Sequence, residues 1–195
     1  MENGEKLMSG EESLKIITEM INKTQMNIRQ GIFHLLFWGW LIFACSLSEY
    51  LLLKFTHYAS PWYVWFFTIP GVAVSMAYGF IKGRKVRIQT YADKLYMWTW
   101  FSFLFAALVL FVIQMGKMES ITQYILIIAA IPTFISGFII KFRPLILGGA
   151  SFWLFALAAH FGGQEFAGLV MPIAMFSGYI VPGYLLKSKI DNDKI

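Results

Sequence analysis

The sequence predicts an all-α polytopic membrane protein, with six transmembrane helices preceded by a cytoplasmic amphipathic helix. The first observation behind this prediction is the composition: of 195 residues, 58% are hydrophobic and only 14% are charged. A soluble domain carries about 25% charged residues, so a water-soluble globule is excluded. The second observation is length. Six apolar stretches approach the roughly 20 residues of a spanning helix, and each is about twice as long as a spanning strand.

Residues 1–30 form the cytoplasmic N-terminal segment, in which a helix is expected over about 10–30. Ser9 followed by Glu12 has the form of a capping box. Projected on a helix, the apolar side chains gather on one face: Leu14, Ile16, Ile17, Met20, Ile21, Thr24 and Ile28. Three interpretations remain open for this helix. It lies flat in the membrane interface, covers the cytoplasmic mouth of the bundle, or binds the helix of a cytoplasmic protein partner.

Residues 31–187 form the transmembrane domain, and residues 188–195 form a cytoplasmic tail. The spans are expected at about 32–53, 62–81, 95–115, 121–140, 144–161 and 166–186. Each stretch is apolar on all sides, and a helix satisfies its own backbone hydrogen bonds inside lipid. The lone cysteine, Cys45, lies within the first span, so an intrachain disulfide is excluded and a buried apolar role is expected.

The distribution of basic residues predicts the orientation. Of the 16 lysines and arginines, 14 fall on the side that holds both termini, and only Lys54 and Lys117 fall on the other. The positive-inside rule therefore makes both termini cytoplasmic, in the bacterial cytoplasmic (inner) membrane. The basic loop after the second span is expected to meet lipid headgroups through Lys82, Arg84, Lys85 and Arg87. Because these charges mark topology, the lipid bilayer is the expected partner and nucleic acid is not.

The even-numbered spans share a pattern of two small residues four positions apart. The second small residue of each pair is a glycine, and an aromatic residue and an isoleucine follow it directly. The pairs are Ser75 and Gly79, Thr133 and Gly137, and Ala174 and Gly178. Small residues at this spacing let helix backbones approach closely in lipid. The pattern predicts three helical hairpins with these residues as the helix-packing face toward the interior. Two alternatives remain open: the pattern reflects composition alone, or the small-residue face forms a contact in a homo-oligomer.

Few ionisable residues lie near the spans, and such residues are the default functional candidates in a membrane. Four could gather into a polar cluster on the outer side: Glu49, His57, His160 and Glu165. The alternative is that each reaches water at the interface on its own. The sequence contains no phosphate-binding glycine loop, nucleophile elbow or paired-cysteine motif. An enzyme is therefore not expected, and neither a metal nor a cofactor is assigned.

Several short stretches in order along the chain resemble a family of small six-span bacterial membrane proteins that has no assigned activity. They are Glu12-Ser13-Leu14 with Ile16-Ile17 and Met20-Ile21, Leu36 to Gly39, Ile131-Pro132-Thr133-Phe134 with Gly137, Phe142-Arg143-Pro144-Leu145 with Gly148-Gly149, Trp153-Leu154-Phe155-Ala156, and Pro182-Gly183. The resemblance implies six spans in the cytoplasmic membrane and provides no catalytic residue.

Two functions of different classes remain. The first is a non-enzymatic membrane module that binds or regulates a cytoplasmic protein partner through its N-terminal helix and basic loop. The second is a small transporter or channel for an apolar, amphipathic or weakly charged solute, because internal repeats with broken helices occur in transporters. The packing of the bundle interior separates them: a polar cavity reaching mid-membrane favours transport, whereas a filled interior favours the module.

Overall fold

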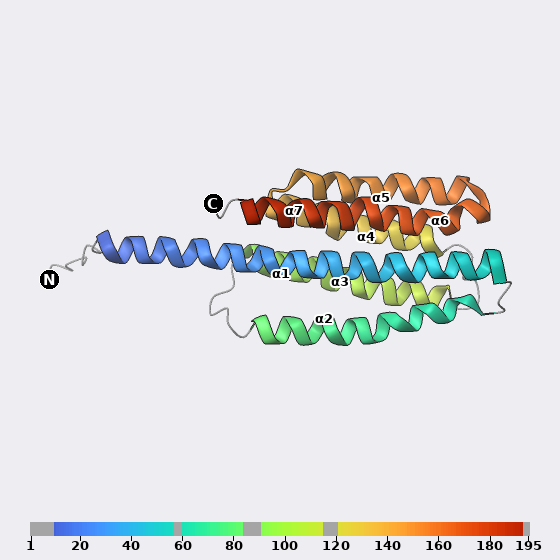
Figure 1. Cartoon of the computed structure of the whole chain (residues 1–195), viewed down its shortest axis with the longest axis horizontal. Helices are drawn as coiled ribbons and strands as arrows, with labels where there is room; N and C mark the ends of the chain where they lie inside the picture. The colour runs from blue at the N-terminus through green and yellow to red at the C-terminus, as the bar shows by residue number, and fades with distance from the viewer. Residues whose placement is uncertain (1–9, 57–59, 84–90, 115–120, 193–195) are drawn as a thin grey trace.

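The computed structural model describes residues 10–56, 60–83, 91–114 and 121–192, and their side chains except at 10–30, 82–83, 92–93 and 164–165. Every element in these ranges is helical (Figure 1): α1 (Gly10–Leu51), η1 (Leu52–Thr56), η2 (Pro61–Phe67), α2 (Thr68–Gly83), α3 (Tyr91–Ile113), α4 (Ile121–Ile140), α5 (Arg143–Phe161), α6 (Gly163–Met175), η4 (Phe176–Ile180) and α7 (Val181–Asn192). The predicted all-α class is confirmed.

Six helical stretches in the described residues are long and apolar enough to cross a membrane, as predicted. They run over 31–56, 61–81, 94–113, 121–140, 143–161 and 166–192. Most boundaries lie within a few residues of the expected ones. The last helix ends at Asn192 rather than near 186. Its polar final turns continue the helix because no residue after Gly183 interrupts the backbone hydrogen bonds.

The N-terminal helix and the first span are one continuous helix. The sequence divides them between residues 30 and 31, yet α1 crosses this point without a break and runs for 42 residues. A single glycine at position 31 lowers helix stability by only about 1 kcal/mol and does not end a helix. In Figure 1 the N-terminal part of α1 projects past the ends of the other helices, at the end of the bundle where both termini lie.

The tightly packed core lies between α4, α5 and the sixth span, with α1 against the sixth span. Of the most apolar stretch of each span, 61% is buried in the sixth, against 6% in the second and 0% in the third. Helix α2 makes its main contacts with α1 and η2, and α3 with α4. The two helices α2 and α3 therefore flank the bundle, and most of their apolar surface is left to lipid.

The sixth span is interrupted at its centre by the π-helical segment η4. Two glycines on other helices contact this segment so closely that neither position has room for a side chain. A Cβ atom on Gly148 of α5 would lie 2.7 Å from the carbonyl oxygen of Gly178, and one on Gly39 of α1 would lie 3.0 Å from Cβ of Tyr179. Single π turns within α-helices often occur at functional sites. Here the segment forms the centre of the helix packing.

Helices α4 and α5 are joined by a very short turn that closes the end of α4. Lys141 has φ 56°, in the left-handed region. The N–H of Phe142 donates to the carbonyl of Gly137 at 2.9 Å, and the N–H of Lys141 donates to that of Phe138 at 3.1 Å. These two bonds are the Schellman pattern, in which glycine usually takes the left-handed position. Lysine at this position keeps a positive charge at the helix end, at the expense of backbone strain.

Candidate functional site

The first span contacts α2 through a row of polar side chains inside the apolar region. Near the end that holds the termini, the indole N–H of Trp38 donates to Ser75 Oγ at 3.3 Å. Ser75 Oγ also lies 2.9 Å from Nδ1 of His34. One hydroxyl on α2 thus joins two side chains of α1. With Nδ1 of His34 unprotonated, each hydrogen bond has one donor and one acceptor: the indole donates to Ser75, and Ser75 donates to His34.

The same row continues at the opposite end of the span. The indole N–H of Trp65 in η2 donates to a carboxylate oxygen of Glu49 at 2.8 Å. The thiol of Cys45, which is buried, donates to the carbonyl of Val64 at 3.4 Å. Polar groups in lipid need partners within the protein. The contact of α1 with η2 and α2 therefore gives two ionisable side chains of the first span, His34 and Glu49, partners within the protein.

These bonds hold α2 against α1, which it also touches through aromatic rings and through the aliphatic side chain of Leu41. The ring of Phe33 stacks on Tyr78, with centroids 3.8 Å apart and planes at 20°. Interhelical hydrogen bonds in membranes each contribute about 0.6 kcal/mol. A row of several such bonds positions α2 without a large buried surface. We name His34, Trp38, Glu49, Trp65 and Ser75 the α1–α2 polar seam.

The structure places the four residues of the expected outer cluster as follows. Glu49 bonds to Trp65, and Nδ1 of His160 lies 3.1 Å from the side-chain oxygen of Gln123 on α4. His57 and the side chain of Glu165 lie outside the described residues. Among the residues that are described, no group of three or more His, Cys, Asp or Glu could hold a metal ion. The described members, Glu49 and His160, thus each bond to a side chain outside the expected cluster.

The small residues of the even spans divide into two groups. Thr133 and Ala174 are buried. A Cβ atom on Gly137 would lie 2.6 Å from the backbone nitrogen of Ile146 in α5, and one on Gly178 would overlap the ring of Phe152. These residues permit close approach among α4, α5 and η4.

The second span departs from the expected pattern. Among the described residues, no atom lies within 4 Å of a Cβ atom built on Gly79, while Ser75 bonds to α1. The expectation that all three even spans line the interior is therefore wrong for α2. The reason is that α2 flanks the bundle, so Gly79 has no helix to approach. No side chain is described for the basic residues that are expected to meet lipid headgroups, Lys82, Arg84, Lys85 and Arg87.

One buried polar contact lies at the core itself. The hydroxyl of Tyr179 in η4 lies 2.9 Å from Oγ1 of Thr133 in α4. Thr133 also donates to the carbonyl of Ala129 at 2.7 Å. The sequence identified Thr133 only as a small packing residue. The link to Tyr179 spans 46 positions of the chain, and no local pattern predicts a pair so far apart.

No protein-family model, curated protein or solved structure matches the chain at the similarity required. The resemblance to six-span bacterial membrane proteins therefore stays a prediction. The fold and the side-chain geometry carry the functional argument.

Proposed function

We propose that the protein is a non-enzymatic membrane module that recruits a cytoplasmic protein partner through the N-terminal part of α1. The observation that carries this proposal is the continuity of α1, from Gly10 to Leu51 without a break. An amphipathic helix lies flat in the interface only where the chain bends away from the spanning helix. An unbroken α1 instead supports an extension that leaves the membrane in line with the first span (Figure 1).

The helical register supports the proposal further. Leu35 and Ile42 are seven residues apart, and both pack against the buried core. Positions 14, 21 and 28 continue this series in steps of seven, and hold leucine or isoleucine. Residues seven apart stay on nearly the same face of a helix, drifting by only about 20° per step. The apolar face of the extension is therefore in line with the face of α1 that holds the sixth span inside the membrane.

This alignment defines the partner's form. Beyond the end of the bundle, no helix among the described residues of this chain lies along the apolar face of the extension (Figure 1). A helix with its own apolar stripe would fit along it, as helices do in coiled coils. A second copy in the same membrane is a poor occupant, because α6 and α7 occupy that side of α1 inside the bilayer. The partner is therefore a helix on the cytoplasmic side.

The bundle interior favours this function over transport. Phe152, Leu126, Ala130 and Ala174 are fully buried, each with 0% exposure. Together with the buried Tyr179 they fill the space between α4, α5 and η4. A filled interior leaves no polar route for a solute at this place. The alternative function as a small transporter or channel has no comparable observation in its favour.

The test uses two neighbouring substitutions that add the same charge to opposite faces of the extension. A photoreactive residue at position 17 is introduced into the full-length protein in its native membrane, and crosslinked adducts are identified by mass spectrometry. Ile21→Asp, on the apolar face, is expected to remove a discrete protein adduct. Asn22→Asp, on the polar face, is expected to retain it. Adducts that consist of lipid alone, or that are equal in the two variants, would contradict the proposal.

A further inference from the structure

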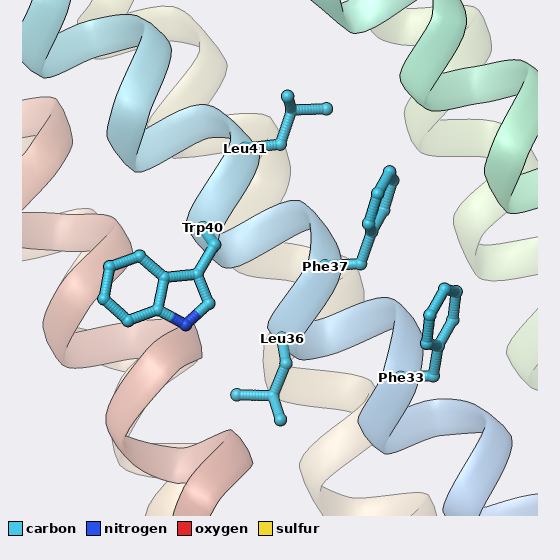
Figure 2. Close-up of a pocket in the computed structure, with 5 residues that line it drawn as sticks. All are labelled: Phe33, Leu36, Phe37, Trp40 and Leu41. Carbon is cyan, nitrogen blue, oxygen red and sulfur yellow. The ribbon is translucent and has the colours of Figure 1, made fainter.

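The contact between α1 and α2 has two halves, which meet where Leu41 packs against Gly71. Figure 2 shows the side of α1 that makes this contact: Phe33, Phe37 and Leu41 lie in one row and point toward α2. A Cβ atom on Gly71 of α2 would lie 2.5 Å from Cδ2 of Leu41, so the two helices are close at this point. The half nearer the termini contains His34, the ionisable residue of the α1–α2 polar seam at this end.

The hydrogen bonds in this half run in one direction. The indole N–H of Trp38 can only donate, and it donates to Ser75 Oγ at 3.3 Å. The hydroxyl of Ser75 lies 2.9 Å from Nδ1 of His34. Because Ser75 already accepts from the indole, its own proton is free to go to Nδ1, which accepts it only when that nitrogen is unprotonated. The contact therefore fits the neutral imidazole.

Protonation of Nδ1 removes this fit. An imidazolium is a donor at both ring nitrogens, so the Ser75 hydroxyl would face two donors and its own proton would lose its acceptor. The remaining neighbours of the ring are aromatic: the centroid of His34 lies 5.5 Å from that of Phe33 and 5.7 Å from that of Tyr78, both edge to face. The charged ring thus brings a donor that the contact accepts only at the loss of another bond.

No acidic side chain among the described residues is placed to neutralise a charge on His34. The titratable neighbour on α2 is Tyr78. On α1 the described acidic residue is Glu49, which follows His34 by a rise of about 22 Å along the helix. Helix α7 packs on another side of α1, and its charged side chains follow Gly183: Lys187, Lys189 and Asp191. A charge without an opposite partner is strongly disfavoured in an apolar contact.

Water lies within reach of the charged ring. The apolar span begins at Gly31 and His34 is its fourth residue, so the Cα atom of His34 lies about 5 Å inside the start of the span. The side chain is half-buried. Polar side chains this close to the interface extend to the aqueous surface. A protonated His34 can therefore leave the contact without crossing the membrane.

We propose that protonation of His34 opens the half of the α1–α2 contact nearer the termini, so that the position of α2 depends on pH. The neutral form fits the closed contact, so the contact is lost as pH falls. The other half stays closed, because Trp65 donates to Glu49 and both forms of a carboxyl group have an acceptor oxygen. Helix α2 otherwise contacts mainly η2, and its free end leads into the basic residues at 82–87. The device does not depend on the proposed recruitment of a partner.

The test measures the distance between two spin labels by electron paramagnetic resonance, in the full-length protein in phosphatidylcholine nanodiscs. The labels are attached through Phe80→Cys on α2 and Leu147→Cys on α5, both at exposed positions. The background is Cys45→Ser, which keeps a donor for the carbonyl of Val64. As pH is lowered from about 8 to about 5, a second, open population is expected to appear. Its ratio to the closed population should rise about ten-fold per pH unit within the transition, the slope for one proton.

Three variants assign the response to one residue. His34→Asn supplies an acceptor oxygen near the place of Nδ1 and cannot be protonated, so it is expected to stay closed over the whole pH range. Ser75→Ala removes both bonds and is expected to show the open population even at the highest pH. Glu49→Gln cannot titrate at the other end of the seam and is expected to respond as the unsubstituted protein does.

Unchanged elution on size exclusion shows that each variant is folded, and the unsubstituted protein can refute the proposal by itself. Absence of an open population on acidification, an equal response in His34→Asn, or loss of the response in Glu49→Gln would overturn the proposal.

Discussion

Replacing Gly137 by alanine should destabilise the protein and the same change at Gly79 should not, although both glycines occupy the same place in the repeated sequence pattern. At Gly137 the added Cβ atom would lie 2.6 Å from the nitrogen of Ile146 and 3.0 Å from its Cα. Both are backbone atoms of α5, so relief requires movement of the whole helix rather than a change of rotamer. At Gly79 the added atom meets nothing within 4 Å.

The expected magnitudes follow from two opposing terms. Overpacking destabilises by about 1–3 kcal/mol, whereas replacing glycine by alanine within a helix gains up to about 1 kcal/mol. Gly137→Ala is therefore expected to lower the free energy of unfolding by about 1–2 kcal/mol. Gly79→Ala is expected to leave it unchanged or to raise it by less than about 1 kcal/mol. For a protein of this size the first change lowers Tm by roughly 2–8 °C.

The assay is unfolding of the purified protein in mild detergent, by titration with sodium dodecyl sulfate and by heating. Circular dichroism follows loss of helix, and tryptophan fluorescence follows loss of packing. The two alanine variants serve as controls for one another, because the chemical change is identical. Equal shifts in the two variants, or a larger loss for Gly79→Ala, would refute the assignment of Gly137 to the core and of Gly79 to the flanking helix.

Three further outcomes are expected in the same assay. Tyr179→Phe should lower stability by only about 0.6 kcal/mol, because Thr133 keeps its bond to a backbone carbonyl; a loss above about 2 kcal/mol would contradict this account. Ser75→Ala should destabilise the protein by about 1 kcal/mol and speed hydrogen exchange at the indole of Trp38, and an unchanged exchange rate would contradict the bond. Lys141→Gly should stabilise the protein by about 1 kcal/mol, since glycine adopts φ 56° without strain, and no gain in Tm would show that the turn is not strained.

The local sequence predicted the spans well because their signal is local. The length and polarity of each apolar stretch set its ends, and α4 begins and ends where the sequence placed it, at 121 and 140. The boundary proposed near residue 30 had a weaker basis. It followed a change in polarity, and polarity alone does not interrupt the hydrogen bonds of a helix, so α1 continues across it.

The candidate site was less predictable. Glu49 stood out in the sequence as an acidic residue within a span, but its expected companions were histidines and another carboxylate. The structure pairs it with the indole of Trp65 instead. An indole N–H beside a carboxylate is a good donor, yet nothing in a sequence of seven tryptophans identifies which one lies opposite Glu49.

By itself, the sequence determined that this protein is a bundle of six membrane helices, because burial of apolar length in lipid acts on each segment separately. Only the tertiary structure decided which helices form the core and which flank it. The spans are similarly apolar, so in lipid hydrophobicity does not determine which of them pack in the core. Close packing determines it instead. The glycines of α4, α5 and η4 contact backbone atoms or aromatic rings of the facing helix, whereas Gly79 of α2 has no described atom within 4 Å of an added Cβ.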